Sequence, residues 1–174
     1  MAVASENRVG AARVAVLIDG THRLALRLGT AAALIAPVVA RLALAVPFFR
    51  SGLTKWSGFL TLSPAAQYLF EMQFQLHLFG RTYPFPAPDL VAYVDAVAEL
   101  LLPVLLVLGL ATRFSALGLL IMTVVIQLVV PEGWANFHLP WAALALAIMA
   151  LGPGPVSIDH TLANWLRPRR TASS

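Results

Sequence analysis

The sequence predicts an all-α fold: an integral membrane four-helix bundle with an interfacial helix between the first two spans. Two observations support this prediction. The chain of 174 residues is 59% hydrophobic and only 11% charged, whereas a soluble domain averages about 25% charged residues. It also contains four apolar segments of the length, roughly 17–25 residues, that a membrane-spanning helix needs. The chain therefore has room for a handful of helices and for no large soluble domain.

The first expected span covers residues 30–49 and contains one charged residue, Arg41. A long connection follows, in which Ser63 and Pro64 are typical of the start of a helix. The segment after them is rich in aromatic and leucine residues. We therefore expect a helix over residues 64–79 that lies at the membrane interface or dips into it.

The other three spans are expected over residues 90–111, 113–130 and 133–152. The loop between the second and third spans is so short that these helices must pack as an antiparallel hairpin. The run GPGP that begins at Gly152 is a strong signal for the end of the fourth helix. The segment after it is expected to form a short amphipathic helix.

Arginines near both ends of the chain predict its orientation. We divide the chain into a basic N-terminal tail (1–27), a transmembrane domain (28–166) and a basic C-terminal tail (167–174). With four spans, both tails and the turn that carries Arg113 fall on one side. Because cytoplasmic loops are enriched in arginine and lysine, we expect a multi-pass protein of the bacterial cytoplasmic (inner) membrane with both termini in the cytoplasm. Three basic residues on the opposite side count against this orientation: Arg50, Lys55 and Arg81.

Charged residues inside the expected spans are candidates for a functional site. A charge at the centre of a bilayer costs from about 2.5 to more than 10 kcal/mol, so it persists where it is paired, protonated or facing a polar cavity. Asp95 and Glu99 lie one helical turn apart in the second span. At about 1.5 Å per residue, Glu99 is expected at the same depth as Arg41, in the outer half of the membrane. Asp95 is expected closer to the surface.

The remaining polar residues of the spans also fall in the outer half: Gln127, Asn136 and His138. One outward-opening pocket is therefore predicted, with Glu99 and Arg41 as its catalytic residues. Asp95 and the three polar residues named above are expected to bind the substrate. A structural interpretation remains open, in which Arg41 and Glu99 form an ion pair that fixes the helix register. For His138, an interhelical hydrogen bond is favoured over a role as a ligand.

The composition excludes several functional classes. The chain has no cysteine, which excludes disulfides, iron–sulfur sites and thiolate metal sites, and also thiol–disulfide exchange by the chain itself. No glycine-rich dinucleotide-binding pattern and no P-loop occur. We expect no metal site, although a group of Asp95, Glu99 and His138 is the alternative. The sequence pI of about 10.3 is assigned to membrane orientation, so no nucleic-acid partner is expected.

Several short motifs occur in order along residues 40–165. They are ARLALAVPFFRSGLTKWSG at the end of the first span, AELLLPVLLVLGLATR in the second, and LGPGPVSIDHTL after the fourth. Together they resemble the DoxX family of small four-helix membrane proteins. The positions that carry the resemblance are Arg41, Gly52, Lys55, Glu99, Gly109, Thr112, Arg113, Gly152, Pro153, Gly154, Ser157 and Asp159.

The resemblance implies a membrane subunit of a redox complex, because the family includes a subunit of an archaeal thiosulfate:quinone oxidoreductase. We therefore expect quinone as the cofactor, none bound covalently, and other oxidoreductase subunits or soluble redox proteins as partners beside the lipid bilayer. The chain is not expected to be a complete enzyme. Glu99 would handle the proton, Arg41 would attract an anion, and His138 would donate a hydrogen bond. The alternative is a non-catalytic scaffold that recruits a soluble partner; a small-solute transporter is less favoured.

Overall fold

The computed structural model describes residues 2–166, with side chains from Asp19 onward. The expected C-terminal tail, residues 167–174, lies outside the described residues. The chain divides into two compact units, Met1–Ala36 and Pro37–Ser174. A single helix, α1 (Ala2–Thr54), begins in the first unit and ends in the second.

The first unit is the N-terminal part of α1. The helix includes the stretch expected as a basic tail, and it carries an exposed ion pair between Asp19 and Arg23, one turn apart. The boundary of that tail at residue 27 stays a prediction. The apolar stretch that is long enough to cross a membrane runs over Asp19–Thr54.

The second unit contains the C-terminal part of α1 together with α3 (Pro88–Leu108), α4 (Thr112–Val129) and α5 (Leu139–Leu151). Two short turns, η2 (Pro131–Gly133) and the π-helical η3 (Trp134–His138), lead into α5. The described residues contain four helices long and apolar enough to span a membrane. The prediction of an all-α membrane bundle is therefore confirmed.

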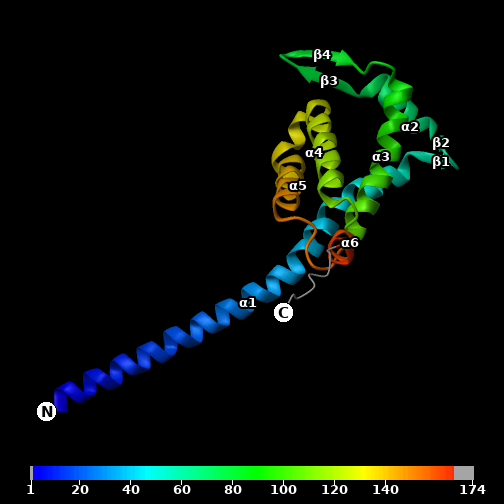
Figure 1. The fold of residues 1–174 in the computed structure, drawn as a ribbon. Helices are drawn as coiled ribbons and strands as arrows, with labels where there is room; N and C mark the ends of the chain where they lie inside the picture. The colour runs from blue at the N-terminus through cyan, green and yellow to red at the C-terminus, as the bar shows by residue number, and fades with distance from the viewer. Residues whose placement is uncertain (1, 167–174) are drawn as a thin grey trace. The chain divides into compact units, whose positions relative to one another are not determined.

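All four spans contribute to one hydrophobic core. In the second unit, α4 packs against both α3 and α5 (Figure 1). The buried apolar residues of the core are Leu44, Ala45, Phe48, Leu106, Ala116, Leu119, Ala145 and Ile148. The antiparallel hairpin of α3 and α4 is confirmed, and it turns at Gly109, whose positive φ of 67° favours glycine. The amphipathic helix after the GPGP run is also confirmed, as α6 (Ile158–Leu166).

The connection between α1 and α3 differs from its prediction. It forms a hairpin of β1 (Trp56–Gly58) and β2 (Thr61–Leu62), then α2 (Pro64–Tyr68) and the π-helical η1 (Leu69–Gln73). A second hairpin follows, of β3 (Gln75–Leu78) and β4 (Arg81–Pro84).

The helix expected over residues 64–79 therefore begins where predicted, but the observed helical segment ends at Gln73, six residues before the predicted end. The Ser63 side chain caps it by accepting a hydrogen bond from the Ala66 amide at 3.2 Å. After Phe74, polar and apolar residues alternate, which is the pattern of a strand. Phe79 and Gly80 both have positive φ values, as the central residues of a tight hairpin turn require.

Candidate functional site

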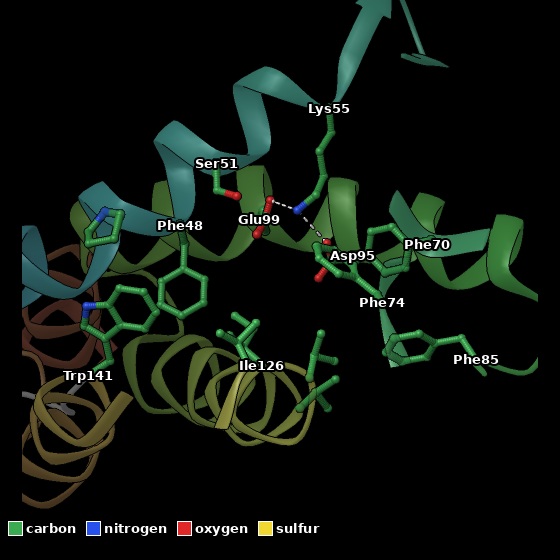
Figure 2. Close-up of a pocket in the computed structure, with 14 residues that line it drawn as sticks. Phe48, Ser51, Lys55, Phe70, Phe74, Phe85, Asp95, Glu99, Ile126 and Trp141 are labelled. Carbon is green, nitrogen blue, oxygen red and sulfur yellow. Dashed lines mark hydrogen bonds and ion pairs between the residues drawn. The ribbon is translucent and has the colours of Figure 1, made fainter. Parts of the chain in front are cut away.

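A cavity of about 230 Å³ lies at the end of the bundle where the connection meets α1, α3 and α4 (Figure 2). One part of its wall is polar and the rest is aromatic or aliphatic. The lining residues are Pro47, Phe48, Ser51, Lys55, Phe70, Phe74, Phe85, Asp95, Glu99, Val125, Ile126, Val129, Val130 and Trp141. We call the polar part, Lys55 with Asp95 and Glu99, the lysine–carboxylate triad.

The triad is a buried group of three charges. The Lys55 ammonium bridges two carboxylates: its Nζ lies 2.7 Å from Asp95 Oδ2 and also donates to Glu99 Oε2. The Glu99 side chain is 4% exposed, Lys55 11% and Asp95 22%. Asp95 is therefore the member of the triad closest to solvent.

The end of α1 places Lys55 against α3. A Cβ atom added to Gly52 would lie 2.9 Å from Glu99 Cβ, so only glycine allows the two helices to approach this closely. The Lys55 amide donates to the Gly52 carbonyl at 3.1 Å, and the Lys55 carbonyl accepts from the Ser63 amide at 2.8 Å. The lysine backbone is thus held on both sides, and its side chain reaches back towards the carboxylates (Figure 2).

Aromatic rings from the connection and from the helices complete the cavity wall. Phe70 lies between Phe74 and Phe85, with ring centroids 5.1 and 5.7 Å away. On another side Phe48 contacts Trp141 at 5.1 Å. The Lys55 Nζ lies 5.9 Å from the centre of the Phe70 ring, within the range of a cation–π interaction.

The charges of the triad do not cancel when all three groups are ionised, because two carboxylates face one ammonium. A buried residual negative charge is costly. The triad is therefore suited to bind a proton or to accept hydrogen bonds from a ligand.

Arg41 does not belong to this cavity. Its guanidinium donates to the carbonyls of Pro37, Val107 and Val156 at 3.2, 3.3 and 2.5 Å. The predicted equal depth of Arg41 and Glu99 is therefore wrong. Gly52, which contacts Glu99, is eleven residues from Arg41, or about 16 Å along the helix. The error arose because α1 continues to Thr54, five residues past the expected end of the span.

Arg41 lies in a second polar cluster, where α6 meets the turn between α3 and α4. The Asp159 carboxylate accepts hydrogen bonds from the Ala111 amide and from both the amide and the hydroxyl of Thr112, each at 2.8 Å. Partial burial raises the pKa of Asp159, but the bonds from Thr112 and Ala111 and the charge of Arg41 hold it below its usual value. Here the side chains bind mainly the backbone at helix ends. We call this group the arginine–aspartate cluster.

Gln127 and His138 form a separate pair beside the cavity. The Gln127 amide nitrogen donates to the Pro131 carbonyl at 3.0 Å, so its Oε1 is the acceptor for His138 Nδ1 at 2.6 Å. The favoured interhelical hydrogen bond of His138 is thus confirmed. The His138 ring packs against Trp141, with centroids 5.6 Å apart.

The predicted single pocket is therefore only partly correct. Of the six predicted site residues, Asp95 and Glu99 line the cavity. Gln127 and His138 adjoin it through Trp141, Asn136 is exposed, and Arg41 lies in the other cluster. Among the side chains that the structure describes, residues 19–166, no group of three or more histidines and carboxylates is placed to hold a metal ion.

Sequence reasoning missed Lys55 as the partner of the carboxylates. In the sequence, Lys55 was noted only as a basic residue on the side predicted to be non-cytoplasmic and as one position of the family motif. The signal was available, because two buried carboxylates need a nearby cation. Lys55 directly follows the last residue of α1, Thr54, and a longer first helix would have placed it near them. The aromatic residues of the connection, such as Phe70 and Phe85, had no comparable signal.

Comparison with known proteins agrees with the motifs. Residues 36–132, more than half of the chain, match the model of the DoxX family. This segment contains every cavity-lining residue except Trp141. An uncharacterized protein of Haemophilus influenzae is 30% identical over 153 residues, which cover 77% of this chain and 87% of that protein. No solved structure matches.

Proposed function

Because this chain belongs to the DoxX family of small membrane proteins, we propose that it is a membrane subunit of a redox complex. In this proposal, the cavity binds the head group of a small, flat, redox-active molecule such as a quinone. The observation that supports it is the lysine–carboxylate triad in the wall of an otherwise aromatic cavity. Such a site offers ring stacking together with proton-accepting groups.

The dimensions and chemistry of the cavity fit a single ring. Its volume of about 230 Å³ is below the roughly 300–1,000 Å³ of pockets for drug-sized ligands. One ring therefore fits, with an apolar tail extending outward. A bound quinone supplies reversible transfer of electrons and protons. The chain itself has no cysteine, so the proposal assigns the electron transfer to a partner subunit.

Each member of the triad has a role in this proposal. Glu99 is the most buried carboxylate and exchanges a proton with the head group. Asp95 is more exposed and connects Glu99 to solvent. Lys55 holds the two carboxylates in place between those exchanges. Arg41 has no catalytic role in this scheme, since its hydrogen bonds go to backbone carbonyls away from the cavity.

The test is binding of a decyl-substituted benzoquinone to the full chain purified in mild detergent, measured by calorimetry. Val129→Trp places a large ring in the cavity wall, and we expect it to abolish binding. Val124→Trp is the matched control, because Val124 lies on the same helix but is 53% exposed and does not line the cavity. Equal affinity of both variants, each shown to be folded, would contradict the proposal.

A second candidate is a scaffold that recruits a soluble partner, and one observation favours it. Helix α6 exposes apolar side chains at Ile158, Leu162 and Trp165, with Trp165 80% exposed. The test is co-purification in mild detergent of the full chain and of a chain that ends at residue 157. A partner lost with α6, but retained in the Val129→Trp variant, would favour the scaffold over the redox subunit.

A further inference from the structure

The polar wall of the cavity contains more hydrogen-bond acceptors than donors. A lysine ammonium has three N–H donors, and two of these are directed to Asp95 and Glu99. The two carboxylates together offer about eight acceptor positions and no donor when ionised. Among the described lining residues, Lys55 is the only cation. A ligand in this cavity therefore meets a surface that accepts hydrogen bonds.

The position of Lys55 limits what it can offer to a ligand. Its backbone is held by Gly52 and Ser63, and its ammonium lies over the Phe70 ring. A ligand carbonyl can accept only the third N–H of this ammonium, and its oxygen then lies beside two carboxylates that together carry one negative charge more than Lys55 balances. The partial negative charge of the carbonyl oxygen is repelled by this excess charge, so a carbonyl gains little in the cavity.

A ligand hydroxyl has the opposite effect. It donates to a free lone pair of Asp95 or Glu99 and leaves both contacts of Lys55 intact. A hydrogen bond to a charged acceptor is also about twice as strong as one between neutral groups. The triad thus discriminates between two forms of a flat ligand that differ only in whether their oxygens carry hydrogen.

We infer that the cavity selects the reduced, hydroxyl-bearing form of its ligand, a hydroquinone-type ring, over the oxidised carbonyl form. This inference rests on the proposed function, since it concerns the same cavity. It defines the substrate class as an aromatic ring with hydrogen-bond donors. When the electron-accepting centre of the partner subunit takes two electrons from the bound hydroquinone, the ring becomes a quinone and releases two protons. Glu99 is then the first acceptor of these protons, and Asp95 passes them to solvent.

The experiment compares the decyl-substituted benzoquinone with its own hydroquinone, kept under anaerobic conditions. Calorimetry on the full chain in mild detergent, at neutral pH, gives both affinities. We expect the hydroquinone to bind at least about tenfold more tightly, as one hydrogen bond to a charged group predicts. Equal affinity, or tighter binding of the quinone, overturns this inference while the proposed function stands. Binding of neither form overturns both.

Variants of the two carboxylates then identify the origin of the preference. Glu99→Gln and Asp95→Asn each remove a charged acceptor, and we expect each to reduce the preference by severalfold. Glu71→Gln and Asp89→Asn are the matched controls, since both residues are exposed and neither lines the cavity. A preference that survives both cavity substitutions together would show that the triad does not cause it, and the inference would be wrong.

Discussion

The two polar clusters of this bundle each contain a deeply buried charged residue. They differ in what their charged groups bind: backbone groups in one cluster, other charged side chains in the other. Arg41 and Glu99 are each 3% exposed. The Arg41 guanidinium binds three backbone carbonyls, and Asp159 binds the backbone and hydroxyl at the start of α4. In the lysine–carboxylate triad the charged groups bind one another and face a cavity.

This difference separates a structural role from a functional one better than burial does. Backbone groups at helix ends have no other partner, so the arginine–aspartate cluster satisfies a need of the fold. The triad satisfies no backbone group through its side chains, and replacing a buried ion group by apolar residues is often neutral for stability. A cluster that the fold does not need is the better candidate for binding a ligand.

The largest expected effect is on the structural side. Arg41→Met removes the hydrogen bonds to the Val107 and Val156 carbonyls and the positive charge near Asp159, and we expect a loss of about 3–5 kcal/mol in the free energy of unfolding. The measurement is an unfolding titration in mixed detergent micelles. Arg50→Met, an exposed arginine on the same helix, is the control and should change stability by less than about 0.5 kcal/mol.

Ligand binding sharpens this result. Where the Arg41→Met protein is still folded, its affinity for the cavity ligand should equal that of the wild type. A stable variant that no longer binds ligand would instead place Arg41 in the functional site. The assignment of a purely structural role to the arginine–aspartate cluster would then be wrong.

The next effect concerns the triad. Lys55→Met leaves two carboxylates without their cation, and we expect a loss of about 2–3 kcal/mol at neutral pH, less than for a fully buried pair because Asp95 is 22% exposed. The triple variant with Asp95→Asn and Glu99→Gln should regain most of this stability, since no unpaired charge remains. If the triple variant is no more stable than Lys55→Met, the triad has a structural role after all.

The sequence was sufficient for the helices and insufficient for the pairing of their charges. Composition and apolar length predict the four spans, and the family motifs fall on both clusters. The depth of a residue, however, depends on where the helix ends, and α1 continues past Pro47 to Thr54. A shift of five residues moved Arg41 away from Glu99 and brought Lys55 to it. The two hairpins depend on turns with positive φ at Leu60 and Phe79. Leucine and phenylalanine are not typical of such turns, so the sequence does not predict them.

A smaller effect is expected where α1 and α3 approach most closely. In Gly52→Ala the new Cβ lies 2.9 Å from Glu99 Cβ and 3.1 Å from the Glu99 backbone, so a helix must move. We expect a loss of about 1–3 kcal/mol together with weaker ligand binding, because the movement opens the triad. The same two measurements apply, unfolding and calorimetry.

Gly118→Ala is the matched control for this substitution. Its Cβ would meet only the end of the Leu102 side chain, at 2.7 Å, and a leucine can change rotamer. It should therefore cost less and leave binding unchanged. Equal effects at the two glycines would mean that the close approach at Gly52 is unrelated to the cavity.

The smallest effect is an acid sensitivity of the arginine–aspartate cluster. Since the pKa of Asp159 is lowered in the folded protein, its contribution to stability is present above the unfolded value of about 3.9 and is lost as the pH falls through the folded value.

Asp159→Ala removes the cap of α4 and should cost about 1–2 kcal/mol at neutral pH. Asp159→Asn keeps an acceptor for Thr112 but has no titrating charge. Its stability should therefore be lower than that of the wild type at neutral pH, and this difference should shrink only as the pH falls below about 3.9. A wild-type and an Asn variant whose unfolding curves differ by the same amount at every pH would show that the Asp159 charge does not stabilise this end of the bundle.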